Sequence, residues 1–157
     1  MFTLVSANDP STAGQKRKEN PMPMIQVWMR SGKNKAYRAA VSASIHQAMM
    51  SVLNLPEDDY FQVTHELEKE ENYIFDPNYF GMPRSPDFLM IRLSFNARPA
   101  AVKQRLFETI ADNLVKSPGL RREDIGMSIV ETNFENWWAH GRRVDKETGT
   151  DARMGKA

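Results

Sequence analysis

The most distinctive candidate for chemistry in this sequence is Pro23, which follows a methionine and directly precedes the alternating run "MIQVWM". If translation starts at Met22, removal of that methionine is expected because proline is a small second residue, and Pro23 then carries a free secondary amine. A neutral amine can abstract a proton beside a carbonyl group, and its protonated form can donate one. An amine can also form an iminium with a carbonyl substrate. The plainer alternative, which the residues alone favour, is an ordinary proline at the first position of a strand.

The residues after Pro23 predict a strand, a helix and a second strand. Residues 24–29 alternate and contain strand formers, as a half-buried strand does. Apolar residues then recur every three or four positions from Tyr37 to Val52, which is the period of one helix face. The helix is expected to end near Pro56, and a second strand is expected over residues 60–66.

The second half of the chain repeats this pattern at an offset of 65 residues. The repeat predicts a strand over residues 89–95, a helix over residues 100–115 and a strand over residues 126–134. We therefore predict an α+β fold in which duplicated β-α-β units form one sheet with both helices on one face. The other face needs a cover, and a neighbouring subunit is expected to supply it. The matched pairs are Met24 with Leu89, Tyr37 with Val102, Val41 with Leu106, Ile45 with Ile110, Met49 with Leu114, Leu55 with Leu120 and Asp59 with Asp124.

The repeat also divides the chain into segments. Residues 1–22 lie outside it and are predicted to be a disordered leader or a wrongly assigned start. Residues 23–143 are predicted to form one domain, and residues 144–157, which lack periodicity, a disordered tail. Residues 69–87 form a long connection rich in Pro, Asn, Tyr and Phe, which suggests a functional or interface loop.

Composition excludes several classes of function. The chain has 157 residues, with 21 basic and 20 acidic side chains, so the charge balance does not favour nucleic acid as a partner. The absence of cysteine excludes disulfides and zinc–thiolate sites, and it suits a reducing cytoplasm. No apolar stretch is long enough to span a bilayer. The three histidines are dispersed without metal-ligand spacing, so no metal site is predicted.

Four stretches, taken together, carry a resemblance to a known family. They are "PMIQVWM", "LNLPEDDYFQV", "RSPDFLMIRLSFNARP" and "SIVETNFENW", which cover roughly residues 23–142. In this order and spacing they resemble the tautomerase superfamily, and within it the malonate semialdehyde decarboxylase branch. The resemblance implies a homotrimer of doubled β-α-β subunits whose catalytic group is an amino-terminal proline and which needs no cofactor.

The resemblance also implies roles for individual residues. Pro23 matches the catalytic proline, Asp59 in "PEDDYFQ" matches the acidic residue that assists it, and Arg98 in "NARP" matches the arginine that holds a substrate carboxylate. Where the decarboxylase has a second basic residue close before that arginine, this chain has Asn96.

Two further residues are predicted to bind substrate. Arg92, on the preceding strand, is the candidate that replaces the missing second cation, and it can equally face solvent. His46 lies where relatives often carry a helix histidine, and its alternative is a place on the helix flank.

Each of the two charged catalytic candidates has a plainer interpretation. Asp59 can be an ordinary turn carboxylate, because its repeat partner Asp124 occupies the same turn. Arg98 matches Lys33 in the repeat, so both can simply decorate a helix start. A cation is poorly placed at the start of a helix, where the dipole prefers anions, and its presence in both repeats hints at an anionic ligand.

The sequence thus predicts a cofactor-free enzyme, a decarboxylase or tautomerase, that uses an amino-terminal proline on small oxo acids in the manner of malonate semialdehyde decarboxylase. One alternative is a phenylpyruvate-type keto–enol tautomerase. Another is a non-catalytic trimeric binding or scaffold protein, because a proline that remains inside the chain has no amine to use.

Overall fold

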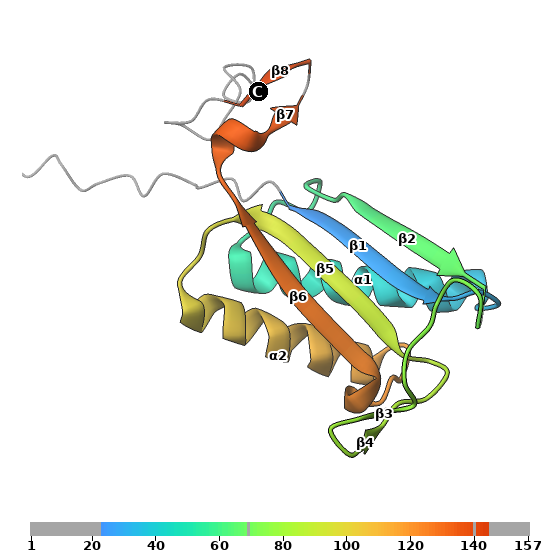
Figure 1. Ribbon diagram of the computed structural model, residues 1–157. Helices are drawn as coiled ribbons and strands as arrows, with labels where there is room; N and C mark the ends of the chain where they lie inside the picture. The colour runs from blue at the N-terminus through green and yellow to red at the C-terminus, as the bar shows by residue number, and fades with distance from the viewer. Residues whose placement is uncertain (1–22, 69, 140, 145–157) are drawn as a thin grey trace, which may run out of the picture.

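The computed structural model describes residues 23–68, 70–139 and 141–144; the predictions for residues 1–22 and 145–157 lie outside this part of the chain. A four-stranded sheet in the order β2-β1-β5-β6 is covered on one face by two helices (Figure 1). The strands are parallel within each unit, and β1 and β5 pair antiparallel at the centre. The first unit is β1 (Met24–Arg30), α1 (Lys35–Leu53) and β2 (Gln62–Leu67), and the second is β5 (Leu89–Asn96), α2 (Ala100–Lys116) and β6 (Ile125–Thr132). This confirms the predicted α+β fold of duplicated β-α-β units.

Two small hairpins extend from opposite ends of the sheet (Figure 1). One hairpin lies in the connection between the two units, and the other follows β6. Their strands are β3 (Asn78–Tyr79) and β4 (Met82–Pro83), then β7 (Trp138–Ala139) and β8 (Arg142–Arg143), and the two short 3-10 helices of the chain are η1 (Arg122–Asp124) and η2 (Phe134–Asn136).

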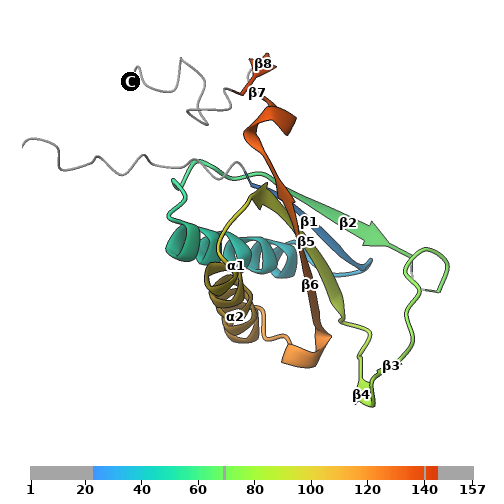
Figure 2. The same ribbon diagram turned by 60° about the vertical axis from the view of Figure 1, so that its left-hand side comes forward.

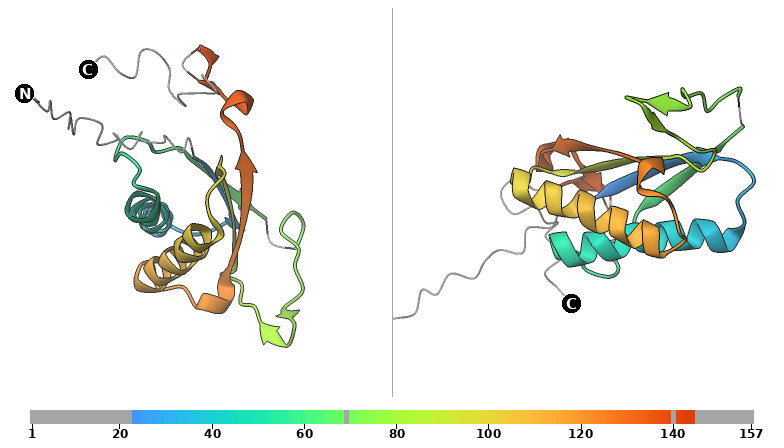
Figure 3. Two further views of the ribbon diagram at one scale, coloured as in Figure 1. Left: turned by 90° about the vertical axis from the view of Figure 1, so that its left-hand side faces the viewer. Right: turned by 90° about the horizontal axis from the view of Figure 1, so that it is seen from below.

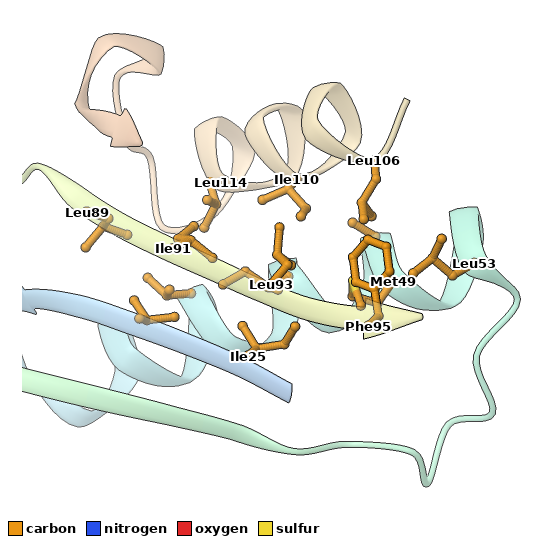
Figure 4. Close-up of a cluster of buried hydrophobic side chains, with 14 of the residues drawn as sticks. Ile25, Met49, Leu53, Leu89, Ile91, Leu93, Phe95, Leu106, Ile110 and Leu114 are labelled. Carbon is orange, nitrogen blue, oxygen red and sulfur yellow. The ribbon is translucent and has the colours of Figure 1, made fainter. Parts of the chain in front are cut away.

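The sheet and the helices form two layers (Figure 2), and the buried apolar side chains of the core come from both of them. Alternate residues of β1 and β5 point towards the helices, which meet them with the apolar face predicted from the period of the sequence. Figure 4 shows Ile91 and Leu93 of β5 on the side towards α2, and Phe95 further along β5 beside Met49 of α1. Full burial of each of these large side chains contributes about 1.5–3 kcal/mol, so this layer holds the two central strands, β1 and β5, against the helices.

Both ends of α1 have a local cause. The Asn34 side chain accepts a hydrogen bond from the backbone N–H of Tyr37 at 2.8 Å and caps the first turn. At the other end Asn54 adopts the left-handed conformation, with φ of 56°, which stops the helix before Pro56. The helix therefore ends where the sequence predicted, and the turn that follows it leads directly to Asp59.

The 65-residue repeat holds for the helices and for the second strand of each unit, where Gln62 and Met127 face the same side, but it is wrong by one residue for the first strands, β1 and β5. The helices start at Lys35 and Ala100, which are 65 residues apart, but the strands end at Arg30 and Asn96, which are 66 apart. The connection of residues 97–99 is one residue shorter than that of residues 31–34. Because side chains alternate along a strand, a shift of one residue exchanges its two faces. Leu89 is accordingly in the core, whereas Met24, its predicted equivalent, points to the other face.

The sheet face away from the helices is not covered by any described element over most of its area, and the β3–β4 hairpin projects on that side (Figure 3). Its side chains include partly exposed apolar residues such as Trp28, Met90 and Val130. No helix in the described part of the chain has the length and hydropathy needed to cross a membrane.

Candidate active site

Pro23 lies at the end of the sheet where β1 and β2 begin and where β5 and β6 end (Figure 1). The proline is buried. The next residues fix its position: Met24 pairs with Ser94 of β5, and the N–H of Ile25 donates to the carbonyl of Phe61 at 3.1 Å. The first residue of the predicted domain is therefore held rigidly between two neighbouring strands.

A small cavity connects Pro23 with two other residues predicted to belong to the site. Pro23, His46 and Asp59 all line it, together with Tyr60 of the same turn. Its volume of about 10 Å³ is no more than the space of one water molecule. The structure thus brings the proline, the acid and the helix histidine into one place, from three separate segments of the chain.

Asp59 has an incompletely satisfied carboxylate. Its backbone N–H closes the turn by donating to the carbonyl of Pro56 at 3.1 Å, and the residue lines the small cavity together with Pro23. The Oδ2 atom is buried and has no hydrogen-bond partner among the residues that the structure describes. Burial raises the pKa of Asp59 above its ordinary value, the neighbouring Asp58 raises it further, and His46 acts in the opposite direction.

Asp124, at the equivalent turn of the second unit, has a very different environment. It is only 1% exposed, and both of its oxygens are occupied. The backbone N–H and the hydroxyl of Ser85 each donate to it at 2.6 Å, and Arg121 Nε donates at 2.9 Å. Burial by itself raises the pKa of Asp124, but the bonds from Ser85 and Arg121 outweigh burial and lower the pKa below its ordinary value. Asp124 is a structural carboxylate, and the turn alone does not explain the environment of Asp59.

His46 holds the turn that carries Asp59. The side chain is buried, and its Nε2 lies 3.0 Å from the carbonyl oxygen of Glu57, so Nε2–H is the donor. The imidazole stacks on the ring of Tyr60 at a centroid distance of 3.9 Å and an angle of 8°. These contacts use one nitrogen and one face of the ring, and they fix the backbone on both sides of Asp59.

Arg98 lies at the same end of the sheet but lines a second and larger cavity. This cavity has a volume of about 380 Å³ and is bounded by the end of β5, the end of β6 and the start of η2. Arg98 Nη1 donates to the carbonyl oxygens of Asn96 and Ala97 at 3.2 and 2.9 Å, which orients the guanidinium. Lys33, the repeat partner of Arg98, forms an ion pair with Asp87. The position of Lys33 at the start of α1 is therefore explained without an anionic ligand.

Asn96 forms a closed network at the wall of the larger cavity. Its Oδ1 accepts from the hydroxyl of Thr132 at 3.1 Å and from Nε1 of Trp137 at 3.2 Å. The same indole N–H also lies 2.8 Å from the Thr132 oxygen. The Nδ2 atom of Asn96 is buried and has no hydrogen-bond partner within the described part of the chain. Sequence reasoning missed this network, because Trp137 lies 41 residues from Asn96 and no local pattern connects the two.

Arg92 is not part of either cavity. It is exposed on the uncovered face of the sheet, where its guanidinium lies 5.5 Å from the centre of the Trp28 ring. It pairs with Gln26 in the middle of β1, several residues away from Pro23. No contact among the described residues bears on its predicted role in substrate binding, which stays a prediction.

Comparison with known proteins agrees with the resemblance described for the sequence. A family described as a tautomerase enzyme matches residues 59–138, and a second family of the same description matches residues 23–82. "Probable tautomerase YusQ" of Bacillus subtilis strain 168 is 33% identical over 123 residues, which cover 77% of this chain and 96% of the relative.

Two groups of solved structures share the fold. The FG41 malonate semialdehyde decarboxylase inhibited by 3-bromopropiolate superposes with a TM-score of 0.67 and 26% identity, over 74% of this chain and 88% of that one. A fused 4-OT wild-type symmetric trimer superposes with a TM-score of 0.63 and 13% identity, over 76% and 94% of the two chains. The doubled β-α-β fold, the two matched families and the similarity to YusQ together establish that this chain belongs to the tautomerase family.

Proposed function

We propose that this chain is a cofactor-free acid–base enzyme that uses the secondary amine of Pro23 on small oxo acids. In this assignment Asp59 stabilises the protonated amine, and Arg98 holds the carboxylate of the substrate. The amine exists only in a chain that begins at Pro23, so we also propose that residues 1–22 are absent from the active protein.

The observation that carries the proposal is the unpartnered Oδ2 of Asp59 in the cavity of Pro23. A buried acceptor left without a donor costs about 1–3 kcal/mol, and a carboxylate costs more than a neutral group. A prolinium at position 23 supplies the missing donor and a compensating charge. The contrast with Asp124 supports the same assignment. The two residues occupy equivalent turns of the two units, but both oxygens of Asp124 accept hydrogen bonds from neighbouring residues.

The match of one tautomerase family supports a start at Pro23, since it begins at that residue. Burial of Pro23 against two strands supports it as well, because the amine is then held in a fixed direction. Burial favours the neutral amine and the Asp59 carboxylate favours the ammonium, so the two effects oppose each other in setting the pKa of the proline.

That balance selects between two reactions. A protonated Pro23 polarises the 3-oxo group of a substrate such as malonate semialdehyde, so that the electron pair released with CO₂ is stabilised. A neutral Pro23 takes a proton from the carbon beside a carbonyl and returns it to the oxygen, which is keto–enol tautomerisation. Similarity to the FG41 malonate semialdehyde decarboxylase supports the first reaction, and similarity to the "probable tautomerase" YusQ supports the second.

We further propose that the protein is a homotrimer in the cytoplasm. The uncovered sheet face with its apolar side chains and the similarity to fused 4-OT trimers support the assembly. The cytoplasmic location rests on the absence of cysteine alone. If Pro23 remains inside the chain, the same assembly is a non-catalytic binding or scaffold protein.

The test is turnover by two forms of the protein whose intact masses are measured first. One form begins at Pro23, after removal of an initiating Met22, and the other retains residues 1–22. Both are assayed for loss of malonate semialdehyde and for ketonisation of phenylenolpyruvate. The form that begins at Pro23 should turn over one or both compounds at a rate at least about 100-fold higher than the longer form does. The reason is that a positioned acid–base group contributes about 10²–10⁴ in rate.

The faster of the two reactions identifies the chemistry. Asp59→Asn in the shorter form should lower the rate without altering the fold, as judged by circular dichroism. The proposal fails if protein confirmed to begin at Pro23 turns over neither compound, or if the longer form is equally active.

A further inference from the structure

We propose that Ser42 and Tyr60 are positioning residues, whose hydrogen bond holds the segment of residues 57–62 against α1 so that Asp59 stays beside Pro23. The proposal rests on the proposed function, in which Asp59 stabilises the protonated amine of Pro23. It adds the residues that keep the acid in place. It is carried by the contacts of Ser42 and by the apolar residues that the second unit has at the equivalent positions.

Ser42 on α1 binds the residues on both sides of Phe61. Its hydroxyl forms a hydrogen bond with the hydroxyl of Tyr60, and it also lies 3.2 Å from Oε1 of Gln62. A serine hydroxyl has one proton, and an amide oxygen can only accept. Ser42 therefore donates to Gln62 and accepts from Tyr60. Nε2 of Gln62 completes the set by donating to the Ser42 carbonyl at 3.0 Å.

The two residues bound by Ser42 lie on either side of the contact that fixes Pro23. That contact is the hydrogen bond from the Ile25 N–H to the Phe61 carbonyl, at 3.1 Å. Both bound residues also line the small cavity, and one of them directly follows Asp59 in the chain. A shift of this segment away from α1 would therefore move the acid away from the proline.

The carboxylate of Asp59 needs such a restraint. Its Oδ2 is buried without a hydrogen-bond partner among the described residues. Burial and then the neighbouring Asp58 raise the pKa of Asp59, and His46 acts in the opposite direction. An unpaired buried charge is more stable in water, so the turn that carries it tends to open. The hydrogen bonds of Ser42 oppose this opening from the side of the helix.

The second unit shows that the fold does not require polar contacts at these positions. The three equivalent positions, 65 residues further along the chain, are all apolar and pack against the hydrophobic core. They are Phe107, Ile125 and Met127. Apolar groups in place of both partners of a hydrogen bond cost a fold little. The polar set occurs in the unit whose acid is unpaired, and the apolar set occurs beside Asp124, whose oxygens are both occupied.

The first experiment measures the pKa of Asp59 in the full-length chain by NMR titration of its carboxyl carbon. Pro23 is in a peptide bond in that form, so the result does not depend on its amine. The pKa should lie above 3.8 in the unchanged chain. Ser42→Ala and Tyr60→Phe should each lower it towards 3.8, because the turn opens and the carboxylate reaches water. Tyr60→Phe keeps the ring that stacks on His46, so its effect isolates the hydroxyl.

The second experiment measures kcat and KM in the form that begins at Pro23. Ser42→Ala should lower kcat by about tenfold or more, because a displaced acid–base group loses its alignment with the reacting atoms. KM should change little, because Arg98, which the proposed function assigns to the substrate carboxylate, is untouched. Ser42→Thr keeps the hydroxyl and should restore kcat. Ser42→Ala combined with Tyr60→Phe should be no slower than Ser42→Ala alone, because both changes remove the same bond.

Ser51→Ala is the matched control. It removes another hydroxyl of α1, which donates to the Ala48 carbonyl at 3.1 Å within the helix, so it should change neither the pKa of Asp59 nor kcat. If Ser42→Ala does not fold, Tyr60→Phe tests the same two expectations.

Three results would overturn the assignment. They are an unchanged pKa of Asp59 in the folded variants, an equal loss of kcat in Ser51→Ala, and a loss of kcat in Ser42→Thr as large as in Ser42→Ala. The expected pKa changes together with no turnover from the form that begins at Pro23 would leave the role of Ser42 and Tyr60 in place and remove the proposed catalysis.

Discussion

At the scale of the residue, Asp59 and Asp124 occupy equivalent turns of the two units, yet their pKa values are shifted in opposite directions. The folded-state pKa of Asp124 is lowered, so its contribution to stability is complete above the ordinary value of 3.8 and is lost as the pH falls through the folded value. The folded-state pKa of Asp59 is raised from the same ordinary value, so ionisation of Asp59 destabilises the fold as the pH rises through that region.

This difference predicts opposite effects of the same substitution in the full-length chain. Asp124→Asn should lower the free energy of unfolding by about 2–3 kcal/mol, because hydrogen bonds to a buried charge are lost. Asp59→Asn should raise it by roughly 1 kcal/mol at neutral pH, because an unpaired buried charge is removed. Thermal unfolding followed by circular dichroism at pH 7 measures both.

The form that begins at Pro23 serves as the comparison for Asp59. There the ammonium is expected to pair with the carboxylate, so Asp59→Asn should no longer stabilise the fold. Stabilisation of equal size in both forms would mean that Asp59 does not interact with the amine of Pro23.

At the scale of the element, the connection between the two units packs against the uncovered sheet face. The Tyr73 hydroxyl donates to the carbonyls of Trp28 and Phe88, each at 3.2 Å. The ring of Phe75 lies against Phe88, and the guanidinium of Arg84 lies 4.7 Å from the centre of the Phe88 ring. The long connection between the two units therefore packs against the sheet through these residues, rather than projecting into solvent as an open loop.

Gly126 of β6 provides a test of that packing. A Cβ at this position would lie 2.8 Å from Cζ of Phe88 and 3.1 Å from Sδ of Met90. The Phe88 ring is enclosed by its neighbours, so Gly126→Ala should lower stability by about 1–3 kcal/mol, as overpacking does. Limited proteolysis should then cut more readily within residues 70–88. Ser128→Ala, at the next position on the same face, is the control, and equal sensitivity in both variants would contradict this account.

At the scale of the whole molecule, the main question is what covers the second face of the sheet. Val130 lies on that face, opposite Ser94, and its side chain is 43% exposed. Val115 on α2 is 41% exposed, on the layer of the molecule formed by the helices. The two valines are thus matched in type and exposure but not in location.

We expect the unchanged protein to sediment as a trimer of 18.0 kDa chains. Val130→Asp should shift the population towards monomers, because in the proposed trimer it places a charge in the interface between subunits. Val115→Asp should leave the trimer unchanged. Analytical ultracentrifugation over a range of concentrations measures this, and a monomer at all concentrations for the unchanged protein would exclude the proposed assembly.

The sequence alone determined the two helices, the four strands of the main sheet and their order along the chain. Alternation over residues 24–29 and the three-to-four period from Tyr37 to Val52 depend on which faces of a strand or helix are buried, and that is a local property of the chain. The repeat then required the second unit to fold like the first. The same local pattern placed Pro23 at the start of β1, where the structure also has it.

Tertiary structure decided what the individual side chains can do. Asp59 and Asp124 look alike in the sequence, and they differ because Ser85, 39 residues from Asp124, reaches only one of them. Asn96 is held by Trp137 from 41 residues away, and no local pattern encodes that bond. The faces of β5 relative to β1 likewise depend on a connection that is one residue shorter. Periodicity fixes where a strand lies, but burial, hydrogen-bond partners and charge depend on residues that only the folded chain brings together.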